Sequence, residues 1–120
     1  ICYDLRFPEI FRQGLLMGAQ VYALGANWPL PRARHRLALG IARAIENQAY
    51  VICVNRAGSD PHLKYAGGSY VIDPMGEVLL DAGEGEGVLS VEIDPALIAS
   101  WREKFPAWRD GRLLRPGASV

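Results

Sequence analysis

Lysine, histidine, methionine and cysteine are scarce in this chain, with two residues of each among 120. Thirteen Lys and Arg residues are matched by thirteen Asp and Glu residues, and the arginines are scattered along the chain. A basic surface that would bind nucleic acid is therefore not expected. Polar residues interrupt the apolar stretches within a few positions, so the sequence predicts no transmembrane helix and no membrane partner.

The shortage of cysteine and histidine also limits the chemistry. Cys2 and Cys53 are too few for a disulfide scaffold, so a reducing, cytoplasmic location is expected. His35 and His62 are far apart and no Cys-x-x-Cys occurs, so neither a metal nor a cofactor is expected. No repeat, low-complexity tract or linker divides residues 1–120, which are expected to belong to one domain with one modest core.

Cys2 opens the run CYDLRFPE at residues 2–9, which has the pattern of a turn between a strand and a helix. The apolar Ile1 resembles the end of a buried strand, and Pro8 suits the first turn of a helix. A cysteine there lies beside free backbone N–H groups, which favour a thiolate and can hold an oxyanion. Cys2 is thus a candidate nucleophile, the alternative being a buried structural cysteine.

Hydrophobic periodicity predicts alternating helices and strands, and hence a mixed α/β fold. Helices are expected at 8–17, 32–48 and 95–104, and strands at 20–24, 50–55, 69–72, 77–80 and 87–93. The strand at 50–55 is expected to be buried on both faces. Loops are expected at 25–31 and 56–67, and an irregular tail at 108–120.

Four local details accompany these elements. The first helix is expected to pack through Ile10, Phe11, Leu15 and Leu16, and the second through Leu37, Ile41, Ala44 and Ile45. Gly40 weakens the second helix by about 1 kcal/mol unless a neighbouring element approaches it closely. Residues 73–76, DPMG, are typical of a hairpin turn, and Asp94 followed by Pro95 is typical of a helix start.

Three ordered blocks resemble the nitrilase superfamily of carbon–nitrogen hydrolases. They are ICYDLRFPE at residues 1–9, ARAIENQAYV at 42–51 and GSYVIDPMGE at 68–77. The resemblance implies an α-β-β-α sandwich, of which residues 1–120 would be the C-terminal part of a single domain. It also implies a Glu–Lys–Cys triad in which Cys2 is the nucleophile. The family's Glu and Lys precede the Cys, and Lys64 and Lys104 match neither position.

The resemblance implies a mechanism of nucleophilic acyl transfer. Cys2 would attack an amide carbon, with the backbone N–H of Tyr3 as one oxyanion donor, and water would hydrolyse the resulting thioester. Without the family's Glu and Lys, the 120-residue chain by itself is expected to be inactive. Family members pair through their outer helices, so the intact protein is expected to be a homodimer or a higher homo-oligomer.

Two further blocks, ANWP at 26–29 and REKFPAW at 102–108, are most similar to the omega-amidase branch. This branch hydrolyses the side-chain amide of small dicarboxylates such as 2-oxoglutaramate. Asn27 and Trp28 would then border the pocket, with the amide orienting the substrate and the indole excluding water. The alternative is a surface loop with a packed Trp.

Other polar residues have two interpretations. Arg6 and Glu9 could orient the substrate, but a salt bridge that holds the turn is favoured. The basic residues that begin the second helix could bind a carboxylate, but a solvated helix start is favoured; they are Arg32, Arg34 and His35. A structural role below the site is expected for Arg43, Glu46 and Asn47, and plain burial for Cys53.

Three other functions stay open. The first is a different cysteine hydrolase, in which His35 or His62 serves as the base for Cys2. The second is a fold remnant or interaction module that has lost its chemistry. The third is a nitrilase or a carbamoyl-amine hydrolase of the same superfamily.

Overall fold

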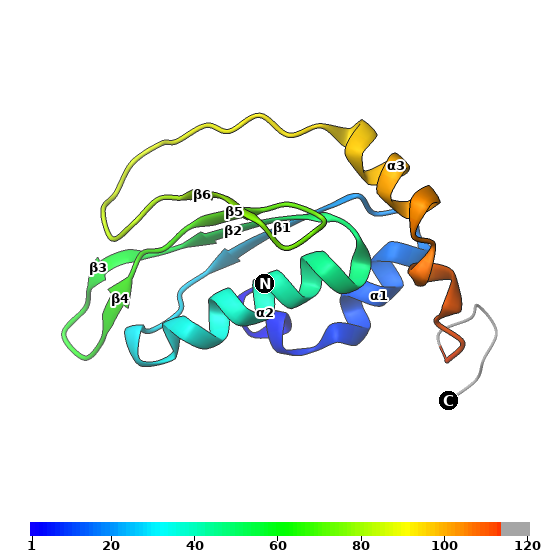
Figure 1. Cartoon of the computed structure of the whole chain (residues 1–120). Coiled ribbons are helices and arrows are strands. Elements are labelled where there is room, and N and C mark those ends of the chain that lie inside the picture. Colours follow the sequence, from blue (N-terminus) through cyan, green and yellow to red (C-terminus); the bar gives the residue numbers. More distant parts are fainter. Residues whose placement is uncertain (114–120) are drawn as a thin grey trace.

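A four-stranded mixed sheet forms the centre of the molecule (Figure 1). The structure, a computed structural model, describes residues 1–113. The strands lie in the order β1 (Val21–Ala26), β2 (Tyr50–Asn55), β5 (Tyr70–Ile72) and β6 (Val78–Asp81). β1 and β2 are parallel, whereas the two later pairings are antiparallel. The mixed α/β fold and these four strands are thereby confirmed.

Helices pack on one face of this sheet and at one end of it (Figure 1). They are α1 (Pro8–Leu16), α2 (Ala33–Asn47) and α3 (Pro95–Lys104), with short 3-10 helices η1 (Cys2–Arg6), η2 (Leu30–Arg32) and η3 (Ala107–Asp110). α2 connects β1 to β2 and runs along the sheet, with α1 beside it, while α3 lies at one end (Figure 1). Within residues 1–113, no helix combines the length and the hydropathy that a membrane span needs.

The core lies between the sheet and the helices α1 and α2. Its buried cluster consists of Leu5, Phe11, Leu24, Trp28, Ala44, Val51, Cys53 and Ile72. Side chains alternate along a strand, so β2 directs Val51 and Cys53 towards the helices and Val54 to the opposite face. Val54 is 55% exposed, so the expectation that this strand is buried on both faces is wrong.

The buried face of α2 differs from the expected one. Leu37 and Ile41 are half-buried and Ile45 is exposed. The residues that the helix buries are Arg36, Gly40, Arg43, Ala44 and Asn47. This face lies close to the sheet, where a Cβ on Gly40 would be 3.1 Å from Ile72 Cδ1. A neighbouring element therefore does approach the helix closely at Gly40.

The inner face of α1 is narrower than expected. Phe11 and Leu15 are buried as predicted, but Ile10 and Leu16 are 52% and 41% exposed. Of these four side chains, Phe11 belongs to the core cluster, whereas Ile10 borders a pocket beside Val21 and Ala23 of β1.

Two expectations about the later chain are wrong. Residues 56–67 are not a plain loop, because β3 (Ala57–Ser59) and β4 (Lys64–Ala66) pair as an antiparallel hairpin. The predicted strand at 87–93 is absent: the segment is extended and has no partner strand among residues 1–113. Val88 is 95% exposed there. The apolar pattern of this segment is that of a strand, but a strand also needs a neighbouring strand with which to pair.

The predicted turn and cap are both present. Asp73 Oδ1 accepts hydrogen bonds from Met75 N at 2.8 Å and Glu77 N at 3.0 Å, and Gly76 has a φ of 89°. Asp94 caps α3 by accepting a hydrogen bond from Ala96 N at 2.9 Å. Of the predicted irregular tail, the part at 108–110 belongs to η3, and residues 114–120 lie outside the described residues.

Candidate active site

Cys2 begins η1 in a conformation that side chains rarely adopt. Its φ is 49°, in the left-handed region, whereas only one other non-glycine residue among 1–113, Gln48, has a positive φ. Such a residue costs about 1–3 kcal/mol and persists only where its surroundings hold it. The Cys2 thiol is free and half-buried, and it packs against the core cluster.

Tyr3, the next residue, is mostly exposed. The first N–H groups of a helix have no acceptor inside it, and the second residue of η1 carries one of them. That N–H therefore lies one residue from the Cys2 sulfur, where an oxyanion donor is needed. Its role as a donor stays a prediction.

Arg43 of α2 is bonded to the turn that Cys2 opens. It is 4% exposed, and its Nε and Nη2 donate to the Leu5 carbonyl at 3.1 and 2.7 Å. Its Nη1 donates to Glu46 Oε1 at 3.0 Å, and Asn47 Nδ2 donates to the Arg43 carbonyl at 2.9 Å. The three residues thus pack and hydrogen bond below the turn, as the sequence suggested.

Arg6, at the end of η1, contacts the loop after β1. Its guanidinium carbon lies 4.7 Å from the centre of the Trp28 ring. Glu9 is exposed, and no Arg6–Glu9 ion pair is present among residues 1–113. The favoured salt bridge is therefore wrong: a stacked cation and ring connect the turn to its neighbour instead.

Trp28 and Asn27 have different environments. Trp28 is 3% exposed, and its Nε1 donates to the Arg32 carbonyl at 2.7 Å. Asn27 is exposed, and its Oδ1 accepts a hydrogen bond from Arg56 at 3.5 Å. Trp28 is therefore a core residue that can form the floor of a site, while the Asn27 amide is accessible to a ligand.

Asn55, at the carboxyl end of β2, is a residue that the sequence reasoning missed. Its Oδ1 accepts a hydrogen bond from Trp28 N at 2.8 Å, and its Nδ2 donates to the carbonyls of Trp28 and Gly67 at 3.3 and 2.8 Å. Ligands of α/β sheets bind outside the carboxyl ends of the strands. The position of Asn55, a polar residue at the end of an apolar run, was therefore the sequence signal that could have identified it.

The β3–β4 hairpin adds a polar cluster next to Asn27. The Tyr65 hydroxyl donates to Asp60 Oδ2 at 2.7 Å, and Arg56 lies 3.6 Å from the same carboxylate and stacks on the Tyr65 ring. The Tyr65 hydroxyl, and then the N–H groups of His62 and Leu63, lower the pKa of Asp60. The same carboxylate raises the pKa of Tyr65. Asp60 thus stays ionised opposite Arg56.

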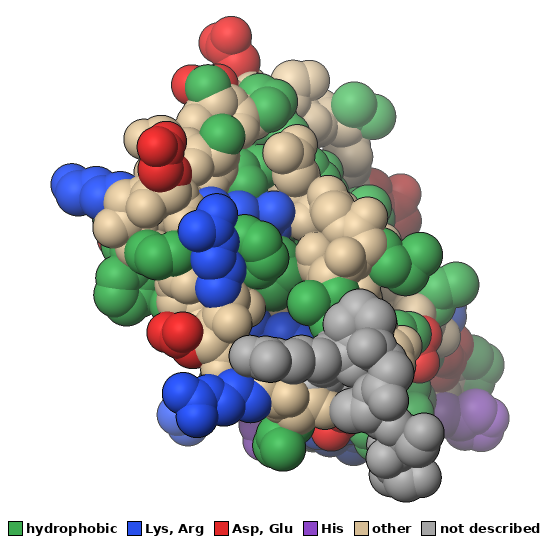
Figure 2. Space-filling view, turned by 90° about the vertical axis from the view of Figure 1, so that its right-hand side faces the viewer, with side chains coloured by type: hydrophobic (Ala, Val, Ile, Leu, Met, Phe, Trp, Pro, Cys, Tyr) green, Lys and Arg blue, Asp and Glu red, His purple; other side chains and the backbone are tan. Residues whose placement is uncertain are grey.

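The remaining candidates stand apart from this arrangement. Arg32, Arg34 and His35 are all exposed, as expected of a solvated helix start. Neither His35 nor His62 hydrogen bonds to Cys2 among residues 1–113, and no group of three potential metal ligands occurs there. Burial raises the pKa of the Cys53 thiol, so this thiol is poorly suited to be a nucleophile. Basic, acidic and apolar side chains are interspersed on the face that Figure 2 shows.

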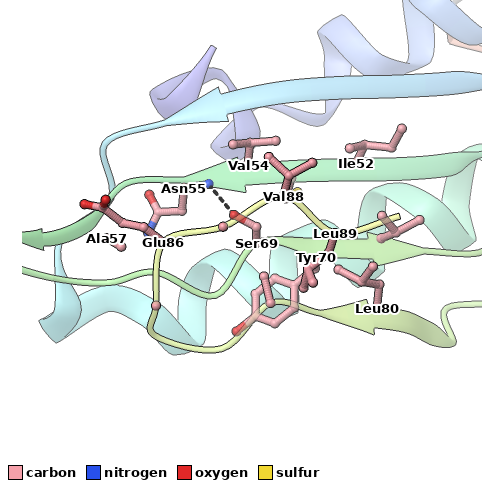
Figure 3. Close-up of a pocket in the computed structure, with 15 residues that line it drawn as sticks. Ile52, Val54, Asn55, Ala57, Ser69, Tyr70, Leu80, Glu86, Val88 and Leu89 are labelled. Carbon is pink, nitrogen blue, oxygen red and sulfur yellow. Dashed lines mark hydrogen bonds between the residues drawn. The ribbon is translucent and has the colours of Figure 1, made fainter. Parts of the chain in front are cut away.

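A groove of about 510 Å³ lies on the sheet face away from α2 (Figure 3). Apolar side chains of β2 and β6 line it together with Val88 and Leu89 of the extended segment. Ser69 Oγ accepts a hydrogen bond from Asn55 N at 3.0 Å at its margin. Cys2 does not line this groove, so the candidate chemistry belongs to the turn and not to the sheet face.

Comparison with known proteins agrees with this arrangement. The family profile for carbon-nitrogen hydrolase matches residues 1–103, and the chain belongs to that family. The 2-oxoglutaramate amidase of Bacillus subtilis (strain 168) is 48% identical over 112 residues, covering 93% of this chain and 43% of the relative. The chain thus spans less than half the length of this relative.

Two solved structures share the fold. The protein XC1258 from Xanthomonas campestris, a CN-hydrolase superfamily protein with an arsenic adduct in the active site, superposes with a TM-score of 0.81. It is 37% identical, and the match covers 97% of this chain and 46% of that one. A mutant of the amidase from Nesterenkonia sp. AN1 matches with a TM-score of 0.72 and 29% identity, covering 92% of this chain and 39% of that one. That structure shows the acetamide moiety of fluoroacetamide added covalently at the active site cysteine.

Proposed function

We propose that the protein containing this chain is an amidase that cleaves a linear amide through a cysteine thioester, with Cys2 as the nucleophile. The observation that carries the proposal is the left-handed conformation of Cys2 at the start of η1, next to the first N–H groups of that helix. The covalent acetamide adduct on the active site cysteine of the Nesterenkonia amidase supports it.

The proposed reaction has two stages. The Cys2 thiolate attacks the amide carbon, and the carbonyl oxygen becomes an oxyanion that the Tyr3 N–H stabilises. The carbon–nitrogen bond then breaks, the nitrogen takes a proton and ammonia leaves a thioester. Water attacks the thioester, releasing a carboxylic acid and regenerating the thiol. The family's Glu would move the protons and its Lys would assist the oxyanion, both from outside these 120 residues.

We propose a dicarboxylate monoamide such as 2-oxoglutaramate as the substrate. The name of the Bacillus subtilis relative supports this choice. The accessible Asn27 amide would orient the substrate, and the Trp28 ring would exclude water from the reacting carbon. Both residues lie on the loop that contacts η1 through Arg6.

The setting of the site is also part of the proposal. Residues 1–120 would be the C-terminal part of a single α-β-β-α domain, and the exposed face of β2 and β6 would pack against the second sheet. A cytoplasmic location is proposed, since a reducing compartment keeps Cys2 and Cys53 as free thiols. A homodimer or a higher homo-oligomer is proposed as well, from the resemblance to a family whose members pair through their outer helices.

The decisive experiment exchanges the two cysteines separately in the full-length protein. Cys2→Ala should abolish ammonia release and leave the circular dichroism spectrum unchanged. Cys53→Ala is the matched control and should retain most of the activity, because Cys53 is buried between α2 and the sheet. Near-normal turnover by Cys2→Ala would refute the assignment.

A substrate panel tests the proposed substrate class. Ammonia release from 2-oxoglutaramate or succinamate should have a much higher kcat/KM than release from nitriles or carbamoyl amines. A site that pairs a substrate carboxylate leaves its polar groups unpaired when that carboxylate is missing. A preference for an uncharged nitrile would overturn the substrate class and leave only the family.

A further inference from the structure

The Arg43 guanidinium is buried with every nitrogen bonded, and two of its three nitrogens serve a single acceptor. Arginine is rarely buried without a partner. Its partner carboxylate, Glu46, has a side chain that is 30% exposed, whereas the Leu5 carbonyl receives both Nε and Nη2. Most of the hydrogen bonding of this buried cation is thus directed at the backbone of η1.

The element that receives these bonds is poorly held by its own hydrogen bonds. η1 has five residues, and the last carbonyls of a helix have no partner inside it. Leu5 lies three positions after Cys2, whose φ of 49° needs support from outside the turn. Arg43 supplies such support at the carbonyl of a residue that is itself buried in the core.

The anchor is rigid at its other end. α2 lies against the sheet, and the Glu46 carbonyl accepts a hydrogen bond from Arg12 of α1 at 2.7 Å. The Arg43 guanidinium carbon also lies 5.4 Å from the centre of the Phe11 ring, within the core cluster. Arg43, which holds η1, is therefore fixed both by its own helix α2 and by its contact with α1.

We propose that Arg43 is a positioning residue, which fixes the Cys2 sulfur for attack by anchoring the Leu5 carbonyl to α2. This inference rests on the proposed function, since it needs Cys2 as the nucleophile. Arg43 does not touch the substrate in this scheme. Its loss displaces the sulfur, and a displacement of about 1 Å lowers the rate of attack by about a hundredfold.

The matched control is Arg102, which also donates three hydrogen bonds, in its case all to backbone carbonyls. Its acceptors are Ala19 at 2.8 Å and Asn47 and Gln48 at 3.1 Å, and none of them belongs to η1. Replacing either arginine by methionine removes three bonds and keeps an apolar stem of similar length. The two variants should therefore lose comparable stability, and only one should lose catalytic rate.

The experiment measures kcat, KM and the unfolding midpoint of the full-length enzyme carrying Arg43→Met, Arg43→Lys, Arg102→Met or Arg102→Lys. Arg43→Met should lower kcat about a hundredfold, with KM nearly unchanged because the substrate contacts remain. Arg43→Lys should recover part of kcat, since an ammonium can donate to the Leu5 carbonyl but cannot reproduce the paired bonds. Both Arg102 variants should keep the wild-type kcat.

Two results would overturn the inference. One is a wild-type kcat for Arg43→Met, and the other is an equal fall in kcat for the Arg102 variant of similar stability. If Arg43→Met does not fold, the Lys pair decides by the same criterion. Cys2→Ala in the same assay separates the two proposals: turnover by that variant refutes the proposed function, whereas an inactive Cys2→Ala with an unaffected Arg43→Met refutes this inference alone.

Discussion

Replacing Asn55 by alanine should destabilise the protein substantially, because one side chain joins two loops at the carboxyl edge of the sheet. The substitution removes three hydrogen bonds: the one from Trp28 N, and the two donated to the carbonyls of Trp28 and Gly67. At about 1 kcal/mol each, the loss is about 3 kcal/mol. That is a large fraction of a typical stability of about 5–15 kcal/mol.

Two features determine how much of this loss is realised. The Gly67 carbonyl keeps a hydrogen bond from Arg36 at 3.2 Å, so it is not left unpaired. Trp28 N belongs to a residue that is 3% exposed, so water replaces its lost acceptor poorly. We therefore expect a fall of about 2–4 kcal/mol in the free energy of unfolding.

Urea unfolding of the full-length protein measures this quantity, and the dependence of the free energy on urea should keep its slope. Asn27→Ala is the matched control: its amide is exposed and accepts a long, 3.5 Å hydrogen bond from Arg56, so the change should stay below about 0.5 kcal/mol. An Asn55→Ala protein as stable as the wild type would show that the three bonds do not hold the loops.

Three further predictions concern the fold and the chain. Burial raises the pKa of Cys53 and raises the pKa of Tyr22 to about 12, so the unfolded state loses these two protons at a lower pH than the folded state does. The free energy of unfolding should therefore fall as the pH rises above about 9, and it should fall by less in Cys53→Ala. Urea unfolding at a series of pH values measures this dependence. Gly76→Ala should lower the free energy of unfolding by about 1–3 kcal/mol, because Gly76 has a φ of 89° and an added Cβ would lie 2.7 Å from Ile45 Cδ1. Gly85→Ala is its control and should leave the stability nearly unchanged, because a Cβ there meets open space. The purified 120-residue chain should release no ammonia from amides above background, because a missing oxyanion donor alone costs at least about a hundredfold; robust turnover that depends on Cys2 would contradict this.

Local signals were reliable where neighbours along the chain supply the interaction. The Asp73 turn and the Asp94 cap both close through hydrogen bonds to residues no more than four positions away. The helices α1 and α2 and the strands β1 and β2 follow from hydrophobic periodicity in the same way. The extended run at 87–93 has the same pattern, but a strand also needs a neighbouring edge.

The candidate site divides along the same line. The turn at Cys2 could be identified from the residue types that follow it, because a cysteine, a short helical turn and Pro8 are contiguous. Its mechanical support could not: Arg43 reaches Leu5 across 38 positions, and Asn55 reaches Trp28 across 27. A periodic pattern treats a charged residue as solvent-facing, so it placed Leu37 and Ile45 on the inner face of α2 in place of the arginines.

The sequence by itself therefore determined the order and type of most elements, the turn that presents Cys2, and the family to which the chain is similar. Tertiary structure decided which face of α2 is buried, that Arg6 stacks on Trp28, and that the hairpin at 57–66 lies beside Asn27. The physical reason is the identity of the partners. The buried arginines and the half-buried Asn55 need particular backbone carbonyls as acceptors, and those carbonyls come from distant segments that the fold alone brings together.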